Sequence, residues 1–190
     1  MISLLYFDSP RINRQVNVAS HFRALGILAG NTGMPIGSKV APAADSVRRE
    51  LQANRATVLY LLGHSEGKGG MIAGGSPALN GQTLATWLPR RVERVPRIIL
   101  FNTCDGVASG LVEASLKAGV QTVVAAAGII PIAVMCPYAE TLFRIWINED
   151  VPLAEAVQQT NTTFAKAGFR FDVFGDPSVT INSLSHSTTP

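Results

Sequence analysis

Short, continuous apolar runs alternate along the chain with longer stretches in which apolar residues recur every three or four positions. The runs are rich in aliphatic and β-branched residues and predict strands at residues 2–7, 57–62, 97–102, 120–126 and 169–174. The stretches with helical spacing cover residues 18–28, 43–53, 107–117, 132–147 and 152–166. Because strands that are apolar along their whole length are buried on both faces, this alternation predicts a mostly parallel sheet with helices on both sides.

Glycine and proline mark the connections between these elements. Three glycines within residues 30–37 follow the first predicted helix, and the glycine-rich stretch at 67–81 has too little helix propensity to form a helix. We expect a turn or hairpin in that stretch, followed by a short helix at 83–88 that ends before Pro89. The expected fold is therefore an α/β protein, a three-layer αβα sandwich with about six strands.

Length and composition favour a single domain. The chain has 190 residues, of which 47% are hydrophobic and 15% are charged, and this is enough to bury one sizeable core. Because no repeat or linker divides the chain, we expect one domain over residues 1–182 and a polar, disordered tail over residues 183–190.

The distribution of charged and apolar residues argues against nucleic-acid and membrane partners. The net charge of +3 comes from scattered basic residues, without the aromatic-interleaved basic stripe of a nucleic-acid-binding surface. No segment approaches the roughly 20 apolar residues of a membrane span, and the apolar start of the chain is too short for an export signal. Two cysteines are also fewer than a secreted disulfide framework usually has. We therefore expect a cytoplasmic protein with both thiols reduced.

Two strings that end predicted strands contain the candidate chemistry. Residues 61–67 include His64, and residues 98–106 include Cys104. The carboxyl ends of strands in an open α/β sheet border the crevice in which ligands bind, so both side chains are expected at one cleft. A neighbouring imidazole favours the reactive thiolate by accepting its proton, and the start of the helix predicted at 107–117 is expected to stabilise the same anion.

Residues 63–67 (GHSEG) also fit the G-x-S-x-G pattern of serine α/β-hydrolases, in which Ser65 would be the nucleophile. Asp172 or Asp176, followed by His186, would then complete a triad. Against this interpretation, such an elbow needs a helix directly after the serine, and a glycine-rich stretch follows instead. No early glycine-rich loop supplies the second oxyanion donor, so the cysteine interpretation is preferred.

The order and spacing of several strings resemble the caspase-like cysteine peptidases of clan CD, and most closely their bacterial CHAT branch. The resemblance covers nearly the whole chain, because it includes the opening strand, the histidine string, the glycine-rich hairpin and the cysteine string. Further similar strings lie at residues 118–126, 153–157 and 174–177. The resemblance implies a caspase-like arrangement of the predicted sandwich.

For the chemistry, the resemblance implies a dyad of Cys104 as nucleophile and His64 as general base, with no third carboxylate required. The backbone N–H groups of Ser65 and Cys104 would form the oxyanion hole. Glycine is usual in the family at the position of Ser65, so a side chain there alters the geometry of the oxyanion hole. No metal ion and no other cofactor is expected, because the chain has no ligand cluster and no complete phosphate-binding loop.

The same resemblance implies where the substrate side chain before the scissile bond, called P1, would bind. The pocket would lie near the end of the first strand and just before the cysteine, where the chain has Asp8, Ser9, Arg11 and Asn102. Asp105 is expected either to cap the following helix or to lie at the mouth of the cleft. Asp8 favours Arg or Lys at P1, whereas Arg11 or Arg14 favours an acidic residue. Because Asp8 lies nearer the strand end, we expect a basic P1 residue.

The activity expected from the resemblance is a cysteine endopeptidase that cleaves a protein substrate through a thioester. Bacterial relatives often act in defence or cell-death systems and stay latent until activated. The resemblance therefore implies a regulatory protein partner or a homo-oligomer. An alternative from a different class is a catalytically inactive adaptor with the same fold, which only Ser65 supports.

Overall fold

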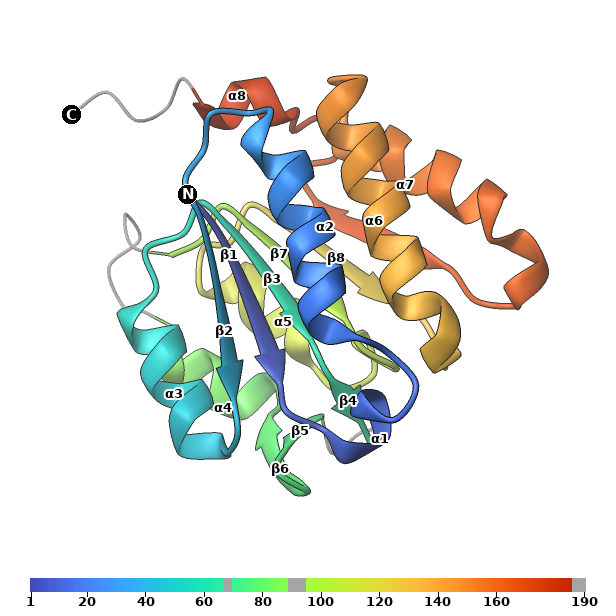
Figure 1. Ribbon diagram of the computed structural model, residues 1–190. Helices are drawn as coiled ribbons and strands as arrows, with labels where there is room; N and C mark the ends of the chain where they lie inside the picture. The colour runs from blue at the N-terminus through green and yellow to red at the C-terminus, as the bar shows by residue number, and fades with distance from the viewer. Residues whose placement is uncertain (67–69, 89–94, 186–190) are drawn as a thin grey trace.

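A six-stranded sheet with the strand order β2-β1-β3-β7-β8-β9 forms the centre of the molecule (Figure 1). The computed structural model describes residues 1–66, 70–88 and 95–185. Neighbouring strands are parallel except β8 and β9, which are antiparallel. The strands are β1 (Ile2–Phe7), β2 (Ile36–Ala41), β3 (Val58–Leu62), β7 (Ile98–Asn102), β8 (Thr122–Ala126) and β9 (Phe171–Gly175). The prediction of a mostly parallel sheet is confirmed.

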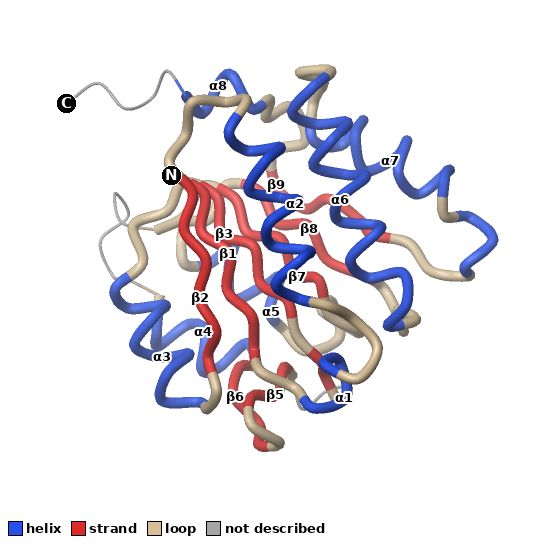
Figure 2. The backbone as a smooth tube through the Cα atoms, in the orientation of Figure 1, coloured by secondary structure: helices blue, strands red, loops and turns tan. Residues whose placement is uncertain are grey.

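Helices cover both faces of this sheet (Figure 2). One face carries α2 (Val18–Gly30), α6 (Ile132–Asn148) and α7 (Leu153–Thr163). The opposite face carries α3 (Ala44–Ala53), α4 (Gly81–Trp87) and α5 (Leu111–Lys117). Shorter helices are α1 (Pro10–Asn13), the 3-10 helix Ala165–Ala167 and α8 (Ile181–Ser185). The predicted three-layer sandwich is therefore confirmed.

Alternate residues of the central strands point to opposite faces and build two cores. On β3, Val58, Tyr60 and Leu62 belong to the core beneath α2 and α6, whereas Leu59 and Leu61 belong to the core on the side of α3 and α5. All five residues of β3 are buried, as are all those of β7 and β8. This two-sided burial is the physical reason why the strands have continuous apolar sequences.

A second, three-stranded antiparallel sheet follows the carboxyl end of β3. It consists of β4 (His64–Ser65), β5 (Met71–Ala73) and β6 (Ser76–Leu79). Strands β5 and β6 form the hairpin predicted within residues 67–81, of which 67–69 lie outside the described residues. The backbone N–H of Gly74 donates to the carbonyl of Asp8 over 2.9 Å, so the hairpin is joined to the loop that follows β1.

The structure differs from the sequence prediction at several elements, among them the short helices α1 and α8, which are not predicted. Strand β2 is not predicted, because it lies at the edge of the sheet and its residues 37–40 are exposed rather than apolar and buried. The helix predicted from residue 107 begins only at Leu111, because Gly110 precedes it with a left-handed backbone (φ 75°). Pro89, which was expected to end α4, lies outside the described residues.

The carboxyl-terminal boundary is also later than predicted. Helix α8 continues to Ser185, and the side chain of Leu184 is buried in the core, so residues 183–185 do not belong to a disordered tail. Residues 186–190 lie outside the described residues. Within the described part of the chain, no helix has the length and apolar character needed to cross a membrane.

Candidate active site

His64 and Cys104 follow the ends of two neighbouring parallel strands in matching register. Leu62 of β3 pairs with Asn102 of β7, and each candidate residue lies two positions beyond its strand's member of this pair. The backbone N–H of Gly63 donates to the carbonyl of Asn102 over 3.3 Å and extends the contact past the sheet. The two chain segments that contain the candidate nucleophile and base therefore lie side by side.

Gly63 allows the chain to turn from β3 into β4 under close packing. A Cβ atom at this position would lie 2.8 Å from the Met71 methyl group and 3.0 Å from the Cβ of Phe7, which is closer than side chains tolerate. Beyond the turn, the hydroxyl of Ser65 donates to the backbone carbonyl of Cys104 over 2.5 Å. The residue after His64 is thus bonded directly to the candidate nucleophile's backbone.

The thiol of Cys104 is half-buried and lies against the backbone of Ile130. The Ile130 N–H donates to the sulfur over 3.2 Å, and the sulfur lies 3.6 Å from the Ile130 carbonyl oxygen. Burial raises the pKa of the Cys104 thiol above its ordinary value, although the Ile130 N–H and the charge of Arg11 act in the opposite direction. The prediction that a helix N-terminus stabilises the thiolate is wrong, because α5 begins seven residues after Cys104, at Leu111.

The imidazole of His64 is partly exposed and contacts a cation. Nη1 of Arg11, in α1, lies 3.3 Å from Nε2 of His64. A guanidinium has no acceptor atom, so Arg11 donates, Nε2 accepts, and the ring proton is on Nδ1. Burial lowers the pKa of His64, the charge of Arg11 lowers it further, and Glu66 opposes both effects. Among the described residues, no hydrogen bond joins the His64 ring to Cys104 or to a carboxylate.

Two of the residues expected in the P1 pocket lie elsewhere. The side chain of Asn102 is only 2% exposed, and its amide donates to the Tyr60 hydroxyl over 2.7 Å and to the Met135 carbonyl over 2.9 Å. It therefore belongs to the core and does not line a substrate pocket. Asp8 accepts a hydrogen bond from the Asn13 amide over 2.8 Å and lines a groove to which neither His64 nor Cys104 contributes.

The two other predicted residues, Ser9 and Asp105, form hydrogen bonds through their backbone groups. Ser9 is buried, and its backbone N–H and carbonyl both contact the Tyr6 hydroxyl. Asp105 has a left-handed backbone (φ 50°), and its N–H donates to the Gly128 carbonyl over 2.9 Å. Its negative charge contributes to the raised pKa of Cys104. Asp105 therefore lies close to the thiol, as its sequence position predicted.

The G-x-S-x-G interpretation lacks the geometry that it requires. Ser65 lies in strand β4 and is only 5% exposed, and its hydroxyl is used in the bond to Cys104. The described chain continues through the β5–β6 hairpin and not directly into a helix. His186, the third member of the alternative triad, lies outside the described residues.

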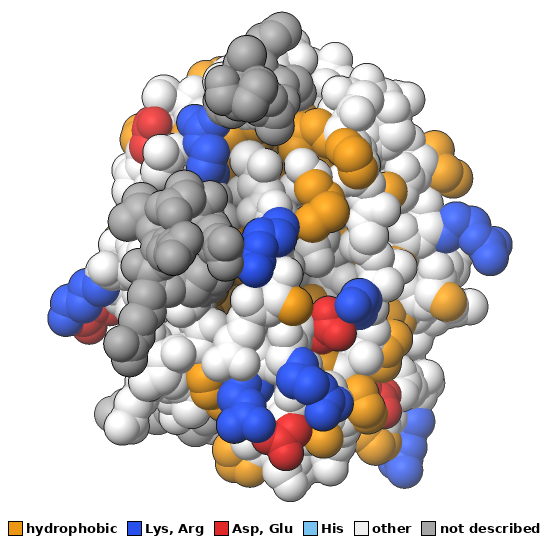
Figure 3. Space-filling view, turned by 90° about the vertical axis from the view of Figure 1, so that its left-hand side faces the viewer, with side chains coloured by type: hydrophobic (Ala, Val, Ile, Leu, Met, Phe, Trp, Pro, Cys, Tyr) orange, Lys and Arg blue, Asp and Glu red, His pale blue; other side chains and the backbone are white. Residues whose placement is uncertain are grey.

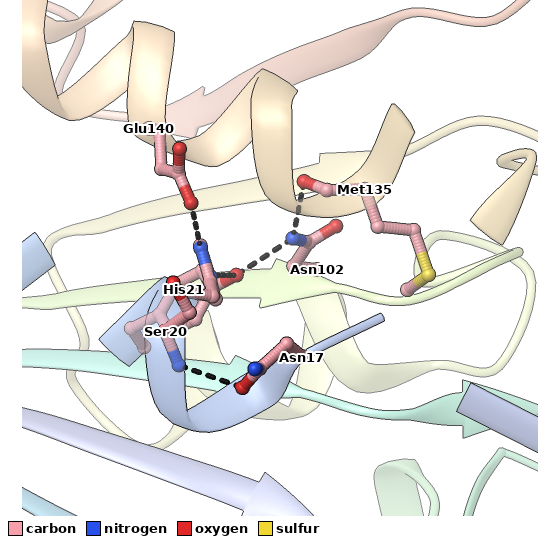
Figure 4. A network of polar contacts seen from close by, with 7 residues as sticks. Asn17, Ser20, His21, Asn102, Met135 and Glu140 are labelled. Atoms are coloured by element: carbon pink, nitrogen blue, oxygen red, sulfur yellow. Dashed lines mark hydrogen bonds and ion pairs between the residues drawn. The ribbon is translucent and has the colours of Figure 1, made fainter. Parts of the chain in front are cut away.

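A buried polar cluster that sequence reasoning missed lies around His21 and Asn102 (Figure 4). His21 of α2 contacts the Glu140 carboxylate through Nδ1 at 2.7 Å and the Tyr60 hydroxyl through Nε2 at 2.9 Å. The same hydroxyl accepts the bond from Asn102, so the cluster joins α2, α6, β3 and β7. Burial lowers the pKa of His21, although Glu140 opposes the effect. One sequence signal was available: His21 precedes Leu25 by four positions and therefore lies on the apolar helix face.

A scan of the chain against models of known protein families found no match, and a search of curated protein sequences likewise found none. The resemblance to caspase-like peptidases therefore rests only on the residues of this chain, and the function that it implies is a proposal.

Proposed function

We propose that the protein is a cysteine endopeptidase in which Cys104 is the nucleophile and His64 the general base. The observation that carries the proposal is the pairing of Leu62 with Asn102, since it brings a histidine and a cysteine to equivalent positions beyond neighbouring strands. The family resemblance supports the same two roles.

The reaction starts from a neutral pair. Burial raises the pKa of Cys104, and burial together with Arg11 lowers that of His64, so the resting groups are a thiol and an imidazole. As the sulfur adds to the substrate's carbonyl carbon, the imidazole takes the thiol proton. The proton then passes to the departing amine when the C–N bond breaks and a thioester forms. Water activated by His64 hydrolyses the thioester and restores the thiol.

The negative oxygen of the tetrahedral intermediate needs donors that are already in place. Within the described residues, the backbone N–H of Cys104 donates to no carbonyl; it contributes to lowering the pKa of its own thiol, and in our proposal it turns to the oxyanion. The N–H of Ser65 is the second donor in our proposal. Because the Ser65 hydroxyl points to the Cys104 carbonyl, that side chain serves to hold the two donors together.

The position of Arg11 changes the expected substrate preference. Asp8, which favoured a basic P1 residue, is bonded to Asn13 and lines a separate groove. Arg11 contacts His64 directly. We therefore propose an acidic P1 residue, whose carboxylate pairs with Arg11 and draws the guanidinium away from Nε2. The base then regains its free lone pair when substrate binds.

Peptide turnover tests the proposal. Four fluorogenic tetrapeptide amides that differ only in Asp, Glu, Lys or Arg at P1 would be assayed with wild-type protein, Cys104→Ala and the control Cys136→Ala. We expect hydrolysis of the acidic substrates, loss with Cys104→Ala and retention with Cys136→Ala. A peptide acyloxymethyl ketone with Asp at P1 should also add its mass to Cys104. Turnover that survives Cys104→Ala would refute the proposed nucleophile.

An inactive adaptor is the second candidate, and three observations favour it. The pKa of Cys104 is raised, the ring of His64 is bonded to Arg11, and Ser65 stands where the family usually has glycine. If Cys104 resists the ketone at neutral pH while the protein is folded, the adaptor function is supported instead.

The setting and the partners are part of the same proposal. Cys104 and Cys136 are both free thiols, which suits a reducing, cytoplasmic environment. A separate regulatory protein or self-association would control access to the site. A role in bacterial defence or cell death follows from the resemblance alone.

A further inference from the structure

A groove of about 950 Å³ lies on the face of the sheet beside α2, away from His64 and Cys104. Helix α2 lies beside β1 on this face and leaves the neighbouring edge strand β2 open (Figure 1). The apolar lining comes from the two strands and from α2. It includes Leu4, Tyr6, Ile36, Val40, Val18 and Phe22. Val40 is 57% exposed, so none of the described elements covers this part of the sheet.

The groove is bordered by positive charge. Arg14, after α1, and Arg23, on α2, both line it and are both exposed. Within the described residues neither arginine forms an ion pair, whereas Lys39 of β2 is paired with Glu50 at 2.9 Å. The one acidic residue of the lining, Asp8, is bonded to Asn13. Two uncompensated cations therefore lie next to an apolar floor.

The side of the molecule that carries β2 also presents charged and apolar side chains. In the space-filling view, basic, acidic and hydrophobic side chains are interspersed over this side (Figure 3). An edge strand also offers unpaired backbone donors and acceptors to an added segment. A ligand that matches all of these features needs apolar side chains, carboxylates and a peptide backbone.

We propose that this groove binds an acidic linear segment of a partner protein. Apolar side chains of the segment lie over Ile36 and Val40, and its carboxylates pair with Arg14 and Arg23. The net charge of +3 disfavours a second copy of this chain as the occupant, because like charges would meet. The proposal does not rest on the peptidase function, since it uses none of the residues of the candidate active site.

One glycine in the lining provides a direct test. A Cβ atom added at Gly26 of α2 would meet no atom within 4 Å. A larger side chain at this position therefore fills the groove without disturbing the fold. Gly30 is equally open at the end of α2 but does not line the groove, so Gly30→Leu is a matched control.

The experiment uses fluorescence polarisation with labelled dodecapeptides that combine glutamate with leucine or phenylalanine at different spacings. A second panel has lysine in place of glutamate. We expect members of the acidic panel to bind wild type and Gly30→Leu alike. Gly26→Leu and the double variant Arg14→Glu/Arg23→Glu should each weaken binding at least tenfold, and the double variant should prefer the lysine panel. Thermal unfolding confirms that each variant is folded. Ser38→Leu, at an exposed position of β2 that lines the groove, replaces Gly26→Leu if the latter does not fold.

Several results would overturn the proposal. It fails if no acidic peptide binds, if the lysine panel binds wild type equally well, or if binding survives in both groove variants. Binding of only the small apolar anion 8-anilinonaphthalene-1-sulfonate would assign the groove to a small molecule instead. A homodimer in sedimentation equilibrium that Gly26→Leu dissociates would assign it to a second copy.

Discussion

His21 and His64 have different surroundings, although both lie close to strand β3: His21 contacts Tyr60 of β3, and His64 follows the end of β3. His21 is 3% exposed, and its two ring nitrogens contact a carboxylate and a hydroxyl. His64 is partly exposed, contacts a guanidinium, and has no hydrogen-bonded carboxylate among the described residues. A histidine whose bonds are all made inside the core contributes to structure. One that faces a cation at the surface can exchange that contact for a substrate.

The two cysteines show the same contrast. Burial raises the pKa of Cys136, inside α6, to about 12, and the charge of Glu140 acts in the same direction. Burial also raises the pKa of Cys104, but there the Ile130 N–H and Arg11 partly offset the effect. The pKa of Cys104 is therefore raised by burial and Asp105, and its other neighbours partly offset this rise, whereas both causes at Cys136 raise its pKa.

The sharpest test of the contrast is His64→Ala. Loss of a general base typically lowers a rate by about 10²–10⁴-fold, and we expect a loss of that size in turnover of an acidic-P1 peptide. The urea midpoint should change little, because the ring is partly exposed. Kinetics and urea unfolding measured on the same preparation check both halves. A large loss of stability with turnover intact would reverse the assignment of the two histidines.

Tyr60→Phe addresses the buried cluster. It removes the hydroxyl that bonds both His21 and Asn102. The buried Nε2 of His21 is then left without a partner, while the Asn102 amide keeps only the Met135 carbonyl. We expect a loss of about 1–3 kcal/mol in the free energy of unfolding, measured in urea. Tyr138→Phe is the control, because Asn161 still accepts from the Phe171 N–H when the Tyr138 hydroxyl is gone. Equal losses in the two variants would show that the cluster has no special structural role.

A smaller effect is expected from Ser65→Ala, which removes the bond to the Cys104 carbonyl. The cost in unfolding free energy should be about 0.5–1.5 kcal/mol, with a several-fold loss of turnover because the oxyanion donors are less well positioned. Ser115→Ala is the matched control, since its buried hydroxyl bonds the Leu111 carbonyl over 2.7 Å, far from the site. Turnover that falls equally in both variants would argue against a positioning role for Ser65.

The smallest expected effect is a dependence of stability on pH to which both histidines contribute. Their pKa values are lowered in the folded protein, so below about pH 6.5 the unfolded chain binds more protons than the native one. Stability should be constant just above that pH and fall as the pH drops toward the folded-state values. Urea midpoints between pH 8 and pH 5 measure this, and His64→Ala should reduce the slope without abolishing it. A flat profile would contradict both lowered pKa values.

Local sequence was sufficient to predict the elements that the cores depend on. The continuous apolar runs identified β3, β7 and β8, because strands buried on both faces require apolar side chains at nearly every position. Strands β1 and β9 were predicted from similar runs, although β9 lies at the sheet edge and only its Phe171 is buried. The same runs located the strand ends, and so the neighbourhood of His64 and Cys104. Strand β2 escaped the prediction because an edge strand with exposed side chains has no such requirement.

The site itself was only partly predictable. The sequence indicated which residues follow the strand ends, but Asn102 turns into the core and Asp8 toward a groove, and neither direction is visible in a local pattern. The contacts of Cys104 with Ile130 and of His64 with Arg11 join segments that are distant along the chain. Such contacts also set the burial and the charges that shift the two pKa values.

From its sequence alone, this chain determines a sandwich of helices around a parallel sheet and a histidine and a cysteine at strand ends, because burial restricts residue type locally. Only the tertiary structure decides that the thiol is partly buried, that a guanidinium contacts the imidazole, that His21 joins a buried cluster, and that a basic groove lies open beside β2. These features depend on which loops and sheet edges lie next to one another. The residue types at exposed or loop positions restrict this arrangement very little.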